Sequence, residues 1–392
     1  MSSNSLALLA CGQPIYNVPP LVNVALALQE AGFMVLVVGY HRDGLPAIEK
    51  LAPRVRILRL RLRSRLIPFG PLRKLLAPAE FLAGCRSVIR KAKPDALLAF
   101  NDLATPLLKT AGPECRTVAW LLEYPEFERM NPLSRAALSW WVRFWASGEA
   151  VVTPTNQRMA LHCGHRPELL ALATFIVANS PRFAAISSSS LSTNGQEAAT
   201  WLAAARARGL ITAVHAGAIG DRYGIGAAIQ GVAAVPEAGL LILGPDHPVA
   251  AADVRRALEA CGGCNRVKWV REVPYRELPT ILQDADVGFV HYVGDCLNTR
   301  FSAPGKLYEY LRAGLAVLTD SESCETAALA AADCVAFFPR PATSQSVGAA
   351  VELLVRRRHE LDAMKDRARR LFAERLCLER QILPLLQWLR RR

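Results

Sequence analysis

A short segment of the chain, TRFSAPGKLYEYLRAGLAVLTD at residues 299–320, combines residue types that hold phosphates and hydroxyl groups. Ser302 suits the N-cap of a helix, and Pro304 suits its first turn. An apolar stripe at helical spacing follows and predicts packing against a sheet, at Leu307, Tyr310 and Leu311. Gly314 can end the helix in a left-handed conformation. The segment therefore predicts a loop, a helix, a tight stop and a buried strand.

The start of this predicted helix could bind an anion. The free amides of Gly305 to Leu307 point out of the helix N-terminus, and Lys306 adds a mobile positive charge. Glu309 lies one turn later and leans back toward the same opening, where it could accept two hydroxyl protons of a ribose. The alternative is a capped helix with an ion pair, either Lys306–Glu309 or Glu309–Arg312. The segment alone leaves both interpretations open.

A glycine-rich loop at residues 217–226 is a second candidate for phosphate binding. It follows an apolar strand and opens a helix, with glycines at positions 217, 220, 224 and 226. Their spacing matches neither the G-x-G-x-x-G fingerprint nor a Walker loop. Arg222 lies inside the loop and could meet a phosphate at the helix start.

The elements that must position these residues alternate between strands and helices along most of the chain. Short apolar strands separated by helices predict parallel sheets that are covered on both faces. The pattern breaks at the Ser/Thr/Asn/Gly-rich segment 184–198, which predicts a linker, and then starts again. A chain of 392 residues also exceeds what one core usually organises. We expect two α/β domains, residues 1–184 and 185–375, with residues 376–392 forming a final helix.

The net charge of +13 is concentrated in the first half, where residues 1–180 hold 21 basic and 12 acidic side chains. Residues 54–74 contain eight Lys or Arg and no acid. Alternation of Arg with Val, Ile and Leu in the first part predicts a strand with one solvated basic face. The apolar and basic loop that follows could bind an anionic membrane surface. A solvated strand and loop, or a nucleic-acid patch, are the alternatives, and no nucleic-acid motif accompanies the arginines.

Ten cysteines are scattered mostly singly, which is typical of free thiols in a reducing compartment. Cys261-Gly-Gly-Cys264 and the His162-Cys163-His165 group are weak metal candidates, because neither is accompanied by a second pair of ligands. No apolar run approaches the ~20 residues that span a bilayer. The first residues lack a basic segment, so we expect no cleaved signal peptide. These features predict a cytoplasmic protein.

Together, the two glycine-containing segments resemble the second domain of the large retaining family of GT-B glycosyltransferases (group 1, family 4-like). The family pattern P-x-K-x-x-E-Y-x-x-x-G-x-P-V stands here as PGKLYEYLRAGLAV, residues 304–317. The segments VPYRELPTILQDADVGFVHY, KPDALLAFND, VAWLLEYPE and VANSPRF are similar to its base-side, acceptor-side and hinge segments. The resemblance implies two Rossmann-like domains that face each other across a cleft, with the last helix packed back on the first.

The resemblance also implies a hexosyltransferase-like activity and a set of site residues. Glu309 would hold the ribose hydroxyls, and the amides of Gly305 to Leu307, with Lys306, would hold the diphosphate of a nucleotide sugar. The remaining implied residues are Ser302 and Gly220 in the donor loops, Tyr275 near the base, Arg222 on the leaving diphosphate, and Asp102 and Glu123 near the acceptor or transferred sugar. No cofactor besides the donor co-substrate is implied, and transfer would retain the anomeric configuration without a metal.

The chain departs from the family pattern at several positions. Phe301 stands where a first glutamate is frequent, Tyr223 stands directly before Gly224 where a lysine is usual, and Leu122 precedes Glu123 where a histidine is frequent. A catalytically degenerate protein that binds a nucleotide sugar or a partner enzyme is therefore the alternative function. We interpret Asp284-Ala-Asp286 as a helix end and strand entry, rather than the metal-binding D-x-D of the other glycosyltransferase fold. We expect a lipid-linked or polysaccharide acceptor at the inner membrane face.

Overall fold

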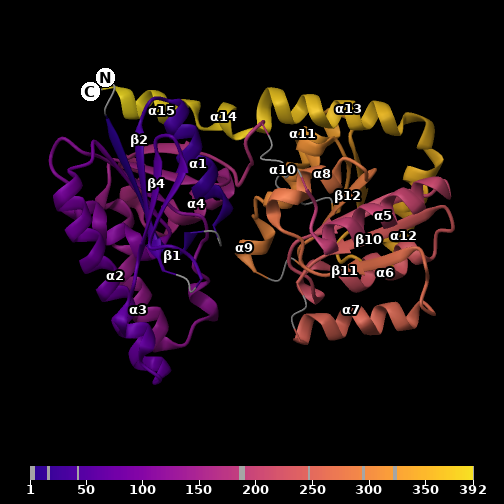
Figure 1. The fold of residues 1–392 in the computed structure, drawn as a ribbon, viewed down its shortest axis with the longest axis horizontal. Helices are drawn as coiled ribbons and strands as arrows, with labels where there is room; N and C mark the ends of the chain where they lie inside the picture. Colours follow the sequence, from indigo (N-terminus) through magenta and orange to yellow (C-terminus); the bar gives the residue numbers. More distant parts are fainter. Residues whose placement is uncertain are drawn as a thin grey trace. The chain divides into compact units, whose positions relative to one another are not determined.

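The computed structural model describes residues 5–15, 18–41, 44–184, 190–245, 248–293, 296–320 and 325–391. The chain divides into two compact units (Figure 1). Unit 1 comprises Met1–Arg182 and Leu378–Arg392, and unit 2 comprises Phe183–Cys377. Each unit is an α/β layer structure built on its own sheet.

Unit 1 contains an eight-stranded sheet with the order β3-β4-β2-β1-β5-β6-β7-β8. All neighbouring strands run parallel except β3 and β4, which pair antiparallel at one edge. The central strands are buried along most of their length, as the apolar runs predict for parallel strands covered on both faces. The strands are β1 Leu6–Pro14, β2 Met34–Tyr40, β3 Ile48–Ala52, β4 Val55–Leu60, β5 Ala96–Phe100, β6 Arg116–Trp120, β7 Ala150–Thr153 and β8 Ala173–Ile176.

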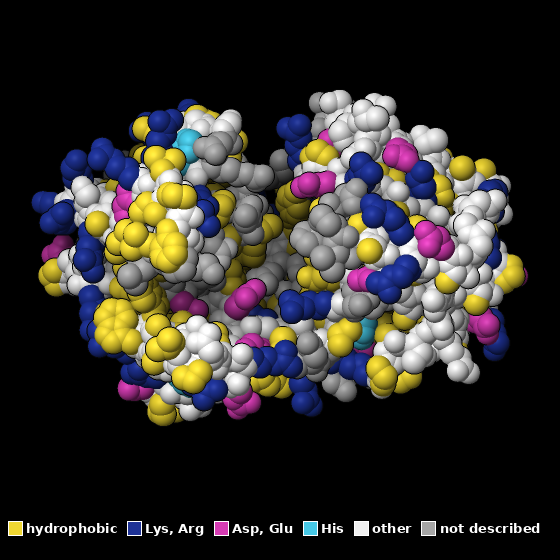
Figure 2. All heavy atoms as spheres, turned by 90° about the horizontal axis from the view of Figure 1, so that it is seen from below, with side chains coloured by type: hydrophobic (Ala, Val, Ile, Leu, Met, Phe, Trp, Pro, Cys, Tyr) yellow, Lys and Arg dark blue, Asp and Glu magenta, His cyan; other side chains and the backbone are white. Residues whose placement is uncertain are grey.

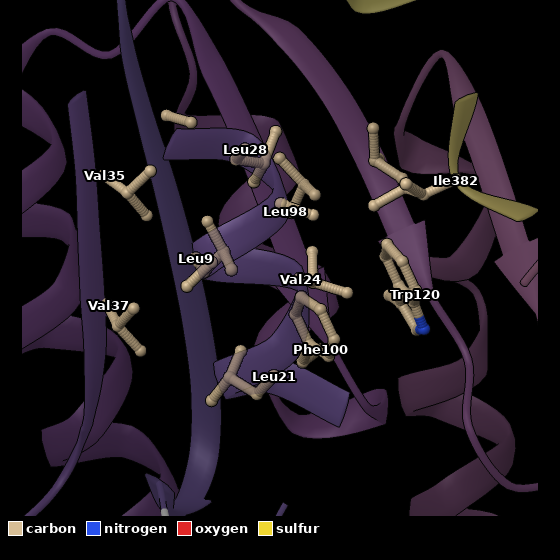
Figure 3. Close-up of a cluster of buried hydrophobic side chains, with 14 of the residues drawn as sticks. Leu9, Leu21, Val24, Leu28, Val35, Val37, Leu98, Phe100, Trp120 and Ile382 are labelled. Atoms are coloured by element: carbon tan, nitrogen blue, oxygen red, sulfur yellow. The ribbon is translucent and has the colours of Figure 1, made fainter. Parts of the chain in front are cut away.

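Two cores cover the two faces of this sheet. On one face, the apolar side of α1 packs with residues of the C-terminal segment against β1, β2, β5 and β6 (Figure 3). On the other face, Phe81 of α2 and Trp145 lie in the same core as Leu8 and Leu97. The α-helices are α1 Pro19–Glu30, α2 Gly70–Ala92, α3 Pro132–Val142, α4 Asn156–His165, α14 Leu378–Gln381 and α15 Leu383–Arg390, with 3-10 helices at Arg63–Leu66, Asp102–Thr110, Phe127–Arg129, Trp145–Ser147 and Pro167–Ala171.

The C-terminal segment is part of the unit 1 core. Ile382 and Leu385 are fully buried in the same cluster as Leu9 and Trp120. Gln381 fixes the segment further, since its side-chain oxygen accepts a 2.8 Å hydrogen bond from the Ala178 amide. Burial of several large aliphatic side chains, at about 1.5–3 kcal/mol each, makes α14 and α15 structural parts of unit 1.

Unit 2 contains a six-stranded parallel sheet with the order β11-β10-β9-β12-β13-β14. The sequence order reverses between β9 and β12, and such a switch point is where ligands of open parallel sheets bind. The strands are β9 Ile211–Ala216, β10 Ala238–Leu243, β11 Val267–Val270, β12 Val287–Val290, β13 Ala316–Asp320 and β14 Val335–Phe338, and the α-helices are α5 Thr193–Ala207, α6 Ile225–Ala233, α7 Pro248–Ala260, α8 Leu278–Leu282, α9 Leu297–Arg300, α10 Gly305–Ala313, α11 Thr326–Ala331, α12 Ser344–Arg356 and α13 Leu361–Leu371.

The prediction of a linker at residues 184–198 is wrong in its second half. Ser192 caps α5 by accepting a 3.2 Å hydrogen bond from the Gly195 amide, and the helix continues from there to Ala207. Ser192, Thr193 and Asn194 are therefore N-cap and first-turn residues, and serine is among the residues preferred at an N-cap. Residues 185–189 of the predicted linker lie outside the described residues.

The basic strand of unit 1 also differs from its prediction at one position. In β4, Arg56 is exposed, as expected for a solvated face. Arg59, however, lies on the inner face with Val55 and Ile57, where its side chain is buried. It forms an ion pair with Glu49 and donates a 2.7 Å hydrogen bond to the Pro46 carbonyl oxygen. These partners satisfy the buried guanidinium, so this arginine contributes to packing rather than to a surface charge.

Helix α3 is far more exposed than a sheet-covering helix would be. Of its eleven residues, only Val142 is buried. Leu133 is 84% exposed and Trp140 is 50% exposed. The preceding residue, Asn131, caps the helix through a 2.9 Å hydrogen bond from the Ser134 amide. The helix is therefore well formed but leaves large apolar side chains in solvent.

Candidate functional site

The glycine-rich loop at the carboxyl end of β9 requires glycine for two physical reasons. Gly224 is the N-cap of α6 with φ of 62°, a left-handed conformation that side chains rarely adopt. A Cβ atom there would also lie 2.4 Å from Cδ2 of His291, which is buried after β12. Gly220 has φ of 119°, so the same backbone argument applies to it. The loop can therefore pass close to the strand ends.

Helix α10 begins later than its sequence indicates. Pro304 is the N-cap and Gly305 is the first helical residue, so the assignment of Ser302 as N-cap is wrong. Proline offers no side-chain acceptor, and no side-chain cap hydrogen bond forms. The Leu307 amide was predicted to be free, and this prediction is wrong, because the amide donates a 2.9 Å hydrogen bond to the Pro304 carbonyl oxygen. Among the described residues, the amides of Gly305 and Lys306 find no partner, and these two remain available at the positive end of the helix dipole.

Lys306 is half-buried at this helix start and lies among aromatic rings. Its Nζ atom is 4.8 Å from the ring centre of Tyr223 and 5.3 Å from that of Tyr292. It is also 3.4 Å from Nε2 of His215. Within the described part of the chain, no carboxylate forms an ion pair with it. Burial lowers the pKa of Lys306 to about 7.

His215, the penultimate residue of β9, lies next to Lys306 and is fully buried. Burial lowers the pKa of its imidazole well below the usual value, and the neighbouring charge of Lys306 lowers that pKa further. The ring is therefore neutral, and its Nε2 atom lies 2.9 Å from the Ala218 carbonyl oxygen, to which it can donate only in one tautomer. The other ring nitrogen, Nδ1, has no partner within the described residues. The lysine thus faces a neutral ring, not a competing cation.

Glu309 is buried and fully engaged within unit 2. One carboxylate oxygen accepts a hydrogen bond from the Tyr275 hydroxyl, and the other forms an ion pair with Arg312 on the next turn. Burial raises the pKa of Glu309, while Arg312 and Tyr275 act in the opposite direction. The alternative of a Glu309–Arg312 pair is therefore present, and the Lys306–Glu309 pair is not. A carboxylate offers about four acceptor positions, so these two contacts leave room for a further donor.

The other predicted donor residues lie on loops of the same unit. Tyr275 begins the 3-10 helix Tyr275–Glu277, is 47% exposed, and places its hydroxyl on Glu309. Arg222 is exposed in the loop before α6 and forms no ion pair with a described residue. Its carbonyl oxygen accepts a 2.8 Å hydrogen bond from Val293, which ties the loop to the residues after β12. Phe301 and Ser302, both half-buried, precede α10.

In unit 1, Asp102 follows the carboxyl end of β5 and is held by a tryptophan. Its Oδ1 atom accepts a 2.7 Å hydrogen bond from Trp145 Nε1, and its carbonyl oxygen accepts one of 2.8 Å from Thr105. Burial raises the pKa of Asp102 to about 6; the Trp145 hydrogen bond opposes this rise, and the charge of Glu123 adds to it. Glu123 is exposed after β6. Two predicted acceptor-side carboxylates therefore lie near each other at one edge of the unit 1 sheet.

Asn101 is a residue that the sequence did not single out. Its φ of 63° and ψ of 166° lie in a region that is almost exclusive to glycine. Such backbone strain, of the order of 1–3 kcal/mol, occurs most often at functional sites. The strained residue lies between β5 and Asp102, and it turns the chain sharply at this edge. No sequence signal identifies it, because asparagine in a loop is common.

The candidate metal groups lie away from these edges or serve other purposes. Asp286, at the amino end of β12, accepts 2.9 Å hydrogen bonds from the amide and hydroxyl of Thr212, as a strand-entry role predicts. Asp284 pairs with Arg206 at 3.4 Å. His162 lies 2.7 Å from the Arg158 carbonyl oxygen inside α4. In the described ranges, no three His, Cys, Asp or Glu residues are placed to hold a metal ion.

Comparisons with known proteins identify the fold. No family model matches the chain, and no curated protein matches its sequence. Solved structures match over nearly the whole chain. A sucrose-phosphate synthase from Thermosynechococcus elongatus is 14% identical, with 98% of each chain covered and a TM-score of 0.75. WaaG, a glycosyltransferase involved in lipopolysaccharide biosynthesis, is 15% identical, with 99% of each chain covered and a TM-score of 0.66.

A third match carries a bound ligand. The HepE protein of Anabaena, in complex with UDP-glucose, is 13% identical, with 98% of each chain covered and a TM-score of 0.67. Three proteins that are 13–15% identical to this chain thus match its fold over both units.

Proposed function

From the GT-B fold of the chain, we propose that it transfers a sugar from a nucleoside-diphosphate sugar to a lipid-linked or polysaccharide acceptor. One observation carries this proposal: Lys306 lies half-buried at the start of α10 with no carboxylate partner among the described residues. A buried cation without a counter-charge is costly unless a ligand supplies the anion. The UDP-glucose bound to the HepE protein supports a diphosphate as that anion.

We assign the donor diphosphate to the carboxyl edge of the unit 2 sheet. The amides of Gly305 and Lys306 would donate to one phosphate, and the Lys306 ammonium would neutralise part of its charge. Arg222, exposed in the loop before α6, would reach the outer phosphate. Charge that develops on the leaving diphosphate would then meet fixed donors rather than water.

We assign the ribose to Glu309. The hydroxyl of Tyr275 donates to this carboxylate, and it occupies one of the positions that a ribose hydroxyl would take. The half-exposed ring of Tyr275 could move aside while Arg312 keeps the carboxylate ionised. This assignment supports a nucleoside donor over inorganic diphosphate, because only a nucleoside brings a diol to the site.

The reaction would proceed with retention and without a metal. The bond between the anomeric carbon and the phosphate oxygen breaks, and a bond from that carbon to the acceptor oxygen forms on the same face. The acceptor proton passes to an oxygen of the leaving diphosphate, so no protein base is needed. In unit 1, Asp102 and Glu123 would bind hydroxyl groups of the acceptor or of the transferred sugar.

An acceptor at the cytoplasmic face of an anionic membrane suits two exposed elements of unit 1. Helix α3 leaves Leu133 and Trp140 in solvent, and residues 130–148 contain two arginines and no acid. The segment 54–74 adds a basic and apolar stretch in which Leu66 is 85% exposed and Phe69 is 63% exposed. Figure 2 shows hydrophobic side chains gathered between Lys and Arg side chains in unit 1, at the left. Aromatic and aliphatic side chains flanked by cations are typical of membrane-surface elements.

A membrane-surface role differs from a membrane-spanning one. No helix in the described ranges is long and apolar enough to cross a membrane. The described cysteines are free thiols, which supports a reducing compartment.

Donor turnover tests the proposed activity. Purified protein is incubated with UDP-, GDP- and ADP-sugars and a membrane extract, and release of the nucleoside diphosphate is measured. We expect release with one donor class, and a loss of at least about 10-fold in the Lys306→Met variant. Binding of a nucleotide sugar without turnover would instead favour a non-catalytic binding protein. Absence of both in the wild type would refute the proposal.

Vesicle binding tests the proposed membrane surface. We expect co-flotation with vesicles of 30% phosphatidylserine, weakened by the double variant Leu133→Ser, Trp140→Ser and by high salt. A control variant in unit 2, Gly226→Ala, should bind as wild type does. Equal flotation of all three proteins would contradict a role for α3.

A further inference from the structure

We propose that Tyr223 and Tyr292 are positioning residues that hold the Lys306 ammonium where the donor diphosphate binds. The proposal rests on the proposed function and adds to it the means by which this chain holds the Lys306 ammonium. Tyr223 stands where the resembling family carries a lysine, so this position contributes a ring instead of a charge.

Three separate elements bring these side chains together. Tyr223 comes from the glycine-rich loop, Tyr292 follows β12, and Lys306 is the second residue of α10. The two rings meet edge to face, with centres 5.3 Å apart and planes inclined by 76°. The ammonium lies within 4.8 Å and 5.3 Å of the two ring centres. Both distances are inside the ~6 Å over which a ring face attracts a cation.

An aromatic ring and a carboxylate differ in how much of the lysine charge they leave available for a phosphate. A carboxylate would cancel the charge, and the ammonium would then have little attraction left for a phosphate. A ring face attracts the cation through its quadrupole and leaves the net positive charge intact. His215 on the third side is neutral, so it adds no charge that competes with the Lys306 ammonium.

The glycine-rich loop leaves room for this arrangement. A Cβ atom at Gly217 would lie 3.9 Å from Cε of Lys306, so the lysine stem already passes along the bare backbone of the loop. Gly224, the residue after Tyr223, has a left-handed φ of 62°, a Cβ atom there would lie 2.4 Å from the His291 ring, and the carbonyl oxygen of Arg222 accepts a 2.8 Å hydrogen bond from Val293. The loop backbone therefore fixes the ring of Tyr223, and the ring fixes the ammonium.

A graded series at position 223 tests the proposal with little change in shape. Phenylalanine, and phenylalanine carrying two or three ring fluorines, replace Tyr223, and binding of a nucleoside diphosphate and of inorganic pyrophosphate is measured by calorimetry. Fluorine removes charge from the ring face but hardly changes its size. We expect Tyr223→Phe to bind within about twofold of wild type, and the fluorinated rings to lose affinity stepwise. Tyr223→Leu should lose about 5- to 30-fold.

The Lys306→Met background identifies the partner of the ring. If the ring acts through the lysine, ring fluorination should not change the affinity once Lys306 is methionine. An affinity that does not change along the fluorinated series in the Lys306 protein would overturn the proposal. An equal loss of affinity in both backgrounds would also overturn it. Failure of the proposed function looks different, because wild type itself would then bind neither pyrophosphate nor any nucleoside diphosphate. Should Tyr223→Leu fail to fold, the fluorinated series still decides, and Tyr292→Phe and its fluorinated analogue repeat the test from the second ring.

Discussion

The protonation of Lys306 should control donor affinity. Burial lowers the pKa of this lysine to about 7, so near neutral pH about half of the free protein carries an uncharged amine. Only the ammonium can pair with a phosphate, and a bound diphosphate therefore raises the pKa of the lysine again. Affinity for a nucleotide sugar should be highest below pH 7 and should fall as the pH rises through 7.

The size of this effect follows from the strength of a charge-assisted hydrogen bond. Such a bond to phosphate contributes about 1.5–3 kcal/mol, which corresponds to about a 10- to 150-fold change in Kd. Affinity should therefore fall by up to about tenfold per pH unit above 7 and level off within about two units. The Lys306→Met variant should bind the nucleotide sugar at every pH with the weaker affinity that wild type reaches at high pH, and its Kd should show no such pH dependence.

Calorimetry with an intact nucleotide sugar measures this directly, because its diphosphate diester does not titrate between pH 5 and pH 9. The other ionisable groups that face the lysine are His215, which is neutral, and the two tyrosines, and Glu309 lies one turn further along α10. Folding stability gives an independent readout. The unfolded chain binds a proton at Lys306 that the folded chain releases above pH 7, so wild type should gain stability from pH 7 to 10 relative to Lys306→Met. A pH-independent Kd in wild type, or the same slope in the variant, would refute the reasoning.

Three further predictions concern other described residues. Gly224→Ala should lower the stability of unit 2 by about 1–3 kcal/mol in urea unfolding because of its φ and the contact with His291, whereas Gly226→Ala, which has open space in α6, should be neutral or stabilising. Asp102→Asn should raise the free energy of unfolding of unit 1 at pH 7 by about 2–3 kcal/mol. The pKa of the wild-type carboxyl is raised to about 6, so the wild-type protein loses stability as the pH rises from 4 to 6 and this carboxyl ionises. A variant that loses the same stability over this pH range would contradict the prediction. Glu309→Gln keeps the size of the side chain but replaces one acceptor oxygen by an NH2 donor, so it should weaken nucleotide binding by about 10-fold in a fluorescence titration; an unchanged Kd would remove the ribose assignment.

The repeated strands and helices were predictable because parallel strands buried on both faces leave continuous apolar runs. The runs at Ala96–Phe100 and Ala238–Leu243 are examples, and both are interior strands of their sheets. The start of helix α10 at Gly305 was not predictable, because Ser302 and Pro304 are both common at helix N-termini and only the surrounding loop decides between them. The inward direction of Arg59 depends on Glu49 in a neighbouring strand, and sequence spacing does not reveal that pairing.

The site was predictable in its residue types and less so in its contacts. A glycine-rich loop and the Gly305-Lys306 helix start predict phosphate binding, because few other uses need bare backbone beside a cation. The aromatic surroundings of Lys306 depend on Tyr223 and Tyr292, which lie 69 residues apart in the sequence and meet only at the strand ends. Contacts between such distant residues follow from sheet order, which periodicity alone does not give.

Turnover of a nucleotide sugar by wild type and by Lys306→Met is the measurement that tests the central claim most directly. The account predicts release of a nucleoside diphosphate by the wild type and a kcat/KM at least about 10-fold lower for Lys306→Met. Equal kcat/KM in wild type and Lys306→Met would contradict it, because the half-buried cation would then play no part in handling the donor.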